Sequence, residues 1–166
     1  MPGSIRTSAP FLLYDPGDVP ILIMGLKFSP GIGVVMTAIV SVLFAVLTGQ
    51  GGPWGVLMHF IATGVYVLTA SLIYRRQRNL SSAVKGLIIA PLVMTGVMVI
   101  ANLLVTPLYL GVTREMVIGM LLPAIIPFNL LKGAINGIIT FLLYKKVSIF
   151  LEAGDQCVSK PNAVRQ

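Results

Sequence analysis

Charged residues are scarce in this 166-residue chain, and acids are the scarcest, with five Asp and Glu against twelve Lys and Arg. Charged residues make up 10% of the sequence and hydrophobic residues 56%, which excludes an ordinary soluble domain and indicates a single-domain integral membrane protein. The one cysteine, Cys157, lies in a polar tail. The sequence therefore offers neither a disulfide framework nor a set of cysteine metal ligands.

The acids all fall outside the long apolar runs, at Asp15, Asp18, Glu115, Glu152 and Asp155. With one histidine in the chain, no Ser–His–acid or paired-carboxylate arrangement is suggested, so we expect no enzyme. A proton-coupled carrier usually buries an acid within its spans, and no Gly-rich phosphate-binding motif is present. Binding of a small molecule is the remaining chemistry, with no separate cofactor expected.

The net charge of +7 is concentrated where apolar runs end. Arg75, Arg76, Arg78 and Lys85 share one expected loop, and the pair Lys145–Lys146 closes the last apolar run. Such clusters are typical of cytoplasmic loops and set membrane orientation. No aromatic residues alternate with these charges, so a nucleic-acid partner is not expected. We predict a multi-pass protein of the cell membrane, with the lipid bilayer as its surroundings.

The apolar runs predict an all-α bundle of five transmembrane segments. The expected segments are 19–26, 31–49, 54–74, 86–105 and 123–146. Pro16, Gly17 and Pro20 break the apolar stretch over 11–26, so the first segment is too short to span alone. The expected domains are an unstructured start over 1–10, a substrate-binding bundle over 11–150 and a polar cytoplasmic tail over 151–166.

The last span carries three polar residues, Asn129, Lys132 and Asn136. At 100° per residue all three share one helix face. An ammonium at the centre of a membrane helix costs about 2.5–3.5 kcal/mol on insertion scales. This arrangement favours a polar ligand site inside the bundle. The alternative is that Lys132 reaches the headgroup region while the asparagines hydrogen-bond to other helices.

With the basic clusters inside, the outer ends of the segments bring other polar residues to a similar depth. The expected set is Asp15, Asp18, His59, Asn102, Tyr109, Asn129 and Lys132. His59 is expected to be a packing residue rather than a metal ligand. Amide, ammonium and carboxylate groups suit a neutral, polyhydroxylated or amide-bearing molecule with a flat apolar body.

Three stretches have a familiar pattern: FLLYDPGDVPILIMG, NLLVTPLYL and IIPFNLLKGAINGIITFLLYKKVS. Over residues 11–148, and most specifically in PFNLLKG at 127–133, the chain resembles the RibU family, the riboflavin-specific substrate-binding (S) components of energy-coupling-factor (ECF) transporters. The resemblance implies a six-helix bundle that captures riboflavin, with FMN as a second candidate ligand. It also implies docking on a transmembrane coupling subunit and two ATPase subunits. The matching ligand positions are Asp15, Asn102, Asn129 and Lys132, with Tyr14 and Tyr109 as weaker candidates.

The chain departs from this family at its start, where MPGSIRTSAP replaces an apolar first helix that carries a small-residue docking motif. Either the start is truncated or mis-assigned, or this version works with five helices. Docking would then require another stripe, such as Thr37/Ser41/Ala45 or Gly133/Gly137. Two alternatives remain open. One is an S component for another vitamin, and the other is a membrane assembly or structural protein whose polar residues pair between helices.

Overall fold

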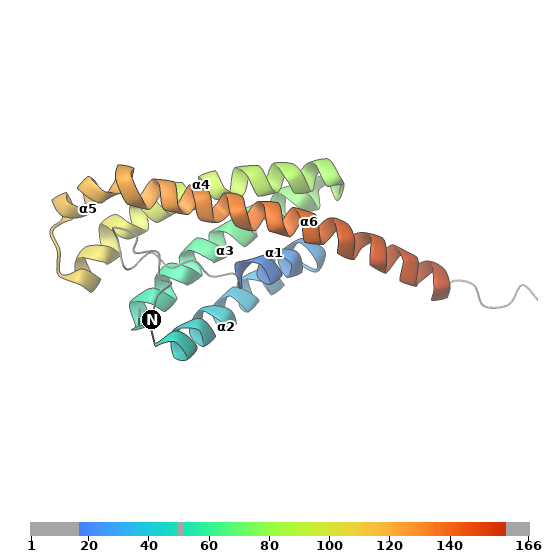
Figure 1. Ribbon diagram of the computed structural model, residues 1–166, viewed down its shortest axis with the longest axis horizontal. Coiled ribbons are helices and arrows are strands. Elements are labelled where there is room, and N and C mark those ends of the chain that lie inside the picture. The colour runs from blue at the N-terminus through green and yellow to red at the C-terminus, as the bar shows by residue number, and fades with distance from the viewer. Residues whose placement is uncertain (1–16, 50–51, 159–166) are drawn as a thin grey trace, which may run out of the picture.

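The structure, a computed structural model, describes residues 17–49 and 52–158, with the side chains of the last helix described up to Leu143. Every regular element in this part of the chain is a helix (Figure 1). The elements are α1 (Asp18–Lys27), α2 (Pro30–Thr48), α3 (Gly52–Gln77), α4 (Leu80–Leu110), α5 (Arg114–Met120), the π-helical turn η1 (Leu121–Ile125) and α6 (Ile126–Val158).

Within residues 17–49 and 52–158, four stretches of helix are long and apolar enough to cross a membrane. They are Pro30–Leu47, Gly52–Gln77, Leu80–Leu110 and Arg114–Leu143. The remaining segment, α1, has 10 residues. Its length of about 15 Å is half the thickness of a bilayer core. It packs against α2, α3 and α6, so the predicted all-α bundle is confirmed with α1 as a half-length segment.

Capping residues fix where the helices begin and end. Ser29 caps α2 by accepting the Ile32 N–H, and Asn79 caps α4 by accepting the Ser82 N–H. Gly49 and Gly111 end α2 and α4 with positive φ angles of 65° and 64°. The expected basic loop is shorter than predicted, because α3 continues to Gln77 and α4 begins at Leu80.

The last apolar run is not one straight helix. α5 already begins at Arg114, so the expected polar loop over 111–115 is only three residues long. η1 then adds a π turn between α5 and α6, in which the Ile126 N–H bonds to Leu121 O. Beyond Lys145 and Lys146, α6 continues to Val158 and extends past the other helices (Figure 1). The expected start of a polar tail at residue 151 therefore falls within a helix.

Glycines allow the central helices to approach closely. A Cβ on Gly86 of α4 would lie 2.8 Å from the Ala70 carbonyl oxygen of α3, and one on Gly133 of α6 would lie 2.6 Å from Pro91 Cβ of α4. Such distances leave no room for a side chain. On Gly137 a Cβ would meet the Tyr66 hydroxyl at 2.8 Å. Both glycines of the Gly133/Gly137 stripe are thus used inside the bundle.

The other small-residue stripe also faces inward. Thr37 and Ser41 are 0% and 1% exposed, and each hydroxyl donates to the backbone carbonyl four residues earlier in α2. Ala45, one turn further on, is half-buried. Most residues of both stripes therefore pack inside the bundle. Docking of the energising module through one of these stripes stays a prediction.

Candidate functional site

The centre of the bundle contains a buried acid that was expected in an outer loop. Asp18 is the first residue of α1 and is 0% exposed. Gly17 forms a turn, and the helix begins at the next residue. A carboxylate buried this deeply is stable only if it is paired and hydrogen-bonded.

Four polar side chains from two other helices surround the Asp18 carboxylate. Thr63 Oγ1 donates to Oδ1 at 2.7 Å, and Asn136 Nδ2 donates to Oδ2 at 2.9 Å. Lys132 Nζ lies 2.9 Å from Oδ2, and His59 Nε2 lies 3.2 Å from Oδ1. A carboxylate offers about four lone-pair positions, and Thr63, Lys132 and Asn136 lie within hydrogen-bonding distance of this one. We call Asp18, His59, Thr63, Lys132 and Asn136 the Asp18 network.

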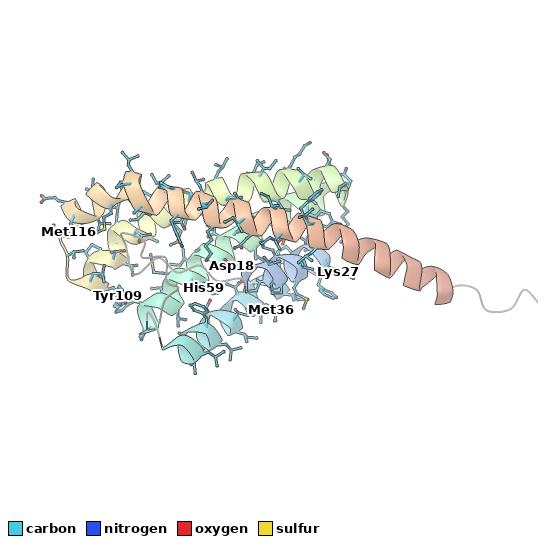
Figure 2. All side chains as sticks on the ribbon, in the orientation of Figure 1. Asp18, Lys27, Met36, His59, Tyr109 and Met116 are labelled. Carbon is cyan, nitrogen blue, oxygen red and sulfur yellow. The ribbon has the colours of Figure 1, made fainter. Side chains whose placement is uncertain are left out.

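His59 attaches a further helix to the network. Its Nδ1 lies 2.7 Å from Ser41 Oγ of α2, and its ring stacks on Phe44 with centroids 5.9 Å apart. The contact between Nε2 and Asp18 is close but poorly aligned for a hydrogen bond. Figure 2 shows His59 and Asp18 side by side in the middle of the bundle. Hydroxyl, aromatic and carboxylate groups surround His59, which is consistent with a packing role.

Asn129, Lys132 and Asn136 lie on one buried face of α6, as predicted, with exposures of 2%, 5% and 0%. Their bonding differs. Lys132 and Asn136 reach Asp18, whereas Asn129 Nδ2 donates to Ile125 O in its own helix, 2.8 Å away. Within the described residues this is the one hydrogen bond of the Asn129 side chain. Its carbonyl oxygen thus retains acceptor capacity beside Lys132.

Asn102 is also buried and also bonded within its own helix. Its Nδ2 donates to Met98 O at 2.7 Å, and its Oδ1 accepts from Thr106 at 2.9 Å. α4 and α6 run in opposite directions and touch at Pro91 and Gly133. From that crossing the helical rise places Asn129 about 6 Å and Asn102 about 16 Å toward the outer end. The expected common depth is confirmed for Asp18, His59 and Lys132 but not for Asn102.

The structure does not bring Tyr109 into this group. Tyr109 is 40% exposed in the last turn of α4, at the end of the bundle and away from Asp18 (Figure 2). Lys27 lies at the opposite end of the bundle in the same view. Tyr14 and Asp15 fall outside the described residues, directly before α1. Of the six predicted ligand positions, three are therefore buried in the bundle: Asn102, Asn129 and Lys132.

Sequence reasoning missed Thr63 and the network role of Asn136. A signal for Thr63 was present, because it lies four residues after His59 and so on the same helix face. Asp18 was recognised as one of the converging polar residues, but not as the partner of Lys132. The signal there was the charge balance: an ammonium buried in α6 needs a buried acid.

Comparison with known proteins identifies the class to which this fold belongs. Residues 5–144 match the family of ECF transporter substrate-specific components. The chain is 37% identical over 149 residues to the riboflavin transporter RibU of Staphylococcus aureus (strain TCH60), an alignment that covers 86% of this chain and 78% of that protein. It is 26% identical over 151 residues to the riboflavin transporter FmnP of Bacillus subtilis (strain 168), covering 86% and 80%.

A solved structure supports the same family assignment. The S component of a bacterial ECF transporter superposes with a TM-score of 0.74 at 36% sequence identity, covering 86% of this chain and 82% of that one. This chain belongs to the family of ECF transporter substrate-specific components. It is therefore a multi-pass membrane protein and the specificity subunit of a transporter, as the sequence resemblance implied.

Proposed function

We propose that this chain binds riboflavin and confers riboflavin specificity on an ATP-driven ECF importer. Support comes from its similarity to two riboflavin transporters and from the polar groups inside the bundle. The observation that carries the proposal is the buried pair Asn129 and Lys132. These residues lie within one turn of each other and offer a ligand an amide oxygen and ammonium N–H donors.

The chemistry of riboflavin fits this arrangement. Its flat ring system is largely apolar but carries carbonyl acceptors and one N–H at an edge, while its ribityl chain carries hydroxyls. Asn129 and Lys132 are suited to the ring edge, and Asn102, nearer the outer end, is suited to a second part of an elongated ligand. Asp15, with Tyr14 and Tyr109 as weaker candidates, completes the proposed contact set from the outer side.

The charge balance of the interior favours riboflavin over FMN. The buried charged side chains in the described part of the chain are Asp18 and Lys132, and they neutralise each other. A phosphate dianion taken into this region would lack a compensating cation. We therefore expect FMN to bind more weakly than riboflavin, unless its phosphate remains in the solvent at the outer end.

The proposed partners are a transmembrane coupling subunit and two ATPase subunits. This proposal follows from membership of the ECF family. Burial of the Thr37/Ser41 and Gly133/Gly137 pairs favours docking of the module on another surface of the bundle.

The test is an absorbance spectrum of the detergent-purified protein followed by titration with riboflavin. Flavin absorbance that copurifies with the protein, or saturable quenching of flavin fluorescence at a 1:1 ratio, is the expected result. A folded protein that quenches neither riboflavin nor FMN would refute the proposal. Binding of a different vitamin in the same format would support the rival S component instead.

A further inference from the structure

Asp18 does more for the ligand site than neutralise a charge. We infer that it is a positioning residue, which fixes the Lys132 ammonium beside Asn129 so that riboflavin affinity depends on a carboxylate that does not touch the ligand. This inference rests on the function proposed above. It concerns the juxtaposition of Asp18 at the start of α1 with Lys132 in the middle of α6.

The Asp18 carboxylate is enclosed by side chains of the bundle, which keep a ligand away from it. Thr63 and His59 face Oδ1, and Lys132 and Asn136 face Oδ2, at distances between 2.7 and 3.2 Å. The side chain is also 0% exposed. Any influence of Asp18 on binding must therefore pass through one of the four side chains that surround it.

The carboxylate is held in place independently of Lys132. The two neutral hydrogen bonds, from Thr63 of α3 and Asn136 of α6, connect residues 45 and 118 positions away in the sequence. Asp18 is also the first residue of a helix packed against α2, α3 and α6. The acceptor for the ammonium is thus built into three helices before any ligand arrives.

Lys132 needs such an acceptor, because its long side chain would otherwise populate many rotamers. An ammonium has three N–H donors, and one of them points to Asp18 Oδ2. Among the described residues, Asp18 is the polar partner of Nζ, so two donors remain for a ligand. Preorganising a donor lowers the entropy lost on binding, which raises affinity without a new contact.

A double-mutant cycle separates positioning from a purely structural ion pair. Riboflavin affinity is measured by fluorescence quenching for wild type, Asp18→Asn, Lys132→Met and the double variant, with thermal unfolding of each recorded in parallel. If Asp18 acts through Lys132, each single substitution weakens binding by about tenfold or more, and the double variant is no weaker than Lys132→Met within about threefold. Losses that multiply in the double variant, or wild-type affinity in folded Asp18→Asn, would overturn the inference.

A second pair of substitutions, which leaves both charges in place, tests the inference if Asp18→Asn does not fold. Thr63→Val keeps both charges but removes one of the bonds that hold the carboxylate. Thr95→Val is its matched control, since Thr95 is buried and donates to Pro91 O in its own helix. We expect Thr63→Val to weaken riboflavin binding about threefold or more in the wild-type background and to have no effect in the Lys132→Met background. Equal affinities for the two valine variants would count against positioning.

The two proposals fail in different ways. If folded wild-type protein does not quench riboflavin, the proposed function is wrong, and the inference about Asp18 is wrong with it. If wild type binds riboflavin but the Asp18 and Lys132 effects multiply, the proposed function stands and only the positioning role is lost.

Discussion

Around Asp18, buried polar side chains bond from one helix to another, whereas at Asn102 and Asn129 they bond back to the helix that carries them. The Asp18 network joins α1, α3 and α6, and through Ser41 also α2. Asn102 and Asn129 each donate to the carbonyl four residues earlier. The two regions are equally buried but use their hydrogen-bonding groups differently.

This difference separates the two tasks of a binding bundle. Bonds between helices fix how the helices sit, so the groups that make them are already committed before a ligand binds. A hydrogen bond within one helix satisfies the side chain without fixing the position of another helix. Such a bond can therefore be exchanged for a ligand contact. Substitutions in the Asp18 network should therefore cause the largest losses of folding stability. Substitutions at Asn102 and Asn129 should cause the largest losses of riboflavin affinity. Lys132 lies at the boundary between the two.

Lys132→Met is the substitution expected to have the largest effect. Removing the ammonium leaves the buried Asp18 carboxylate without its charge partner, so the free energy of unfolding should fall by about 3–5 kcal/mol. Unfolding in a graded SDS titration measures this. The double variant Asp18→Asn/Lys132→Met is the control, since it removes both charges and should regain most of the loss. Equal stabilities for Lys132→Met and wild type would show that the pair does not hold the bundle together.

Asn129→Leu should lower riboflavin affinity strongly while changing folding stability little. We expect riboflavin affinity to fall at least tenfold, or about 1.4 kcal/mol. The free energy of unfolding should change by less than about 1 kcal/mol, because the lost bond is local and leucine is a good helix former. Fluorescence titration measures the riboflavin affinity, and SDS unfolding measures the free energy of unfolding. Thr140→Val, on the same buried face of α6, is the control. A large stability loss with unchanged affinity would favour the structural-protein alternative.

Tyr66→Phe tests a bond between helices that lies outside the network. The Tyr66 hydroxyl of α3 donates to Gly133 O of α6 at 2.8 Å and is buried. Its removal should lower the free energy of unfolding by about 1 kcal/mol, the usual value of one such bond. Riboflavin affinity should stay within threefold of wild type. An affinity loss as large as that of Asn129→Leu would mean that the two regions are not separable in this way.

The sequence was sufficient to predict properties that depend on a single segment of the chain. The hydropathy of each apolar run predicts its span, and a 100° step predicts that Asn129, Lys132 and Asn136 share a face. Both predictions are confirmed, because neither depends on where the other helices are. The family resemblance added the fold and the class of transporter, which periodicity alone does not give.

Properties that depend on helix rotation and register were beyond sequence reasoning. Nothing local to Asp18 indicates that its carboxylate meets Lys132, 114 positions later, since that contact requires α1 and α6 to pack in one particular orientation. Close approaches such as Gly133 against Pro91 are part of that packing. The π turn at Leu121–Ile125 means that the first residues of the expected span over 123–146 precede the α-helix, which begins at Ile126.

Tyr109→Phe should have the smallest effect of these substitutions, and it tests where the ligand site ends. Tyr109 is 40% exposed in the last turn of α4, at the end of the bundle. A hydroxyl in this position is hydrated before binding, so exchanging water for ligand changes little free energy. We expect riboflavin affinity within about threefold of wild type and unchanged stability. A tenfold loss would extend the ligand site from Asn129 past Asn102 to the outer end, and would show that an exposed group, rather than the buried asparagines alone, determines specificity.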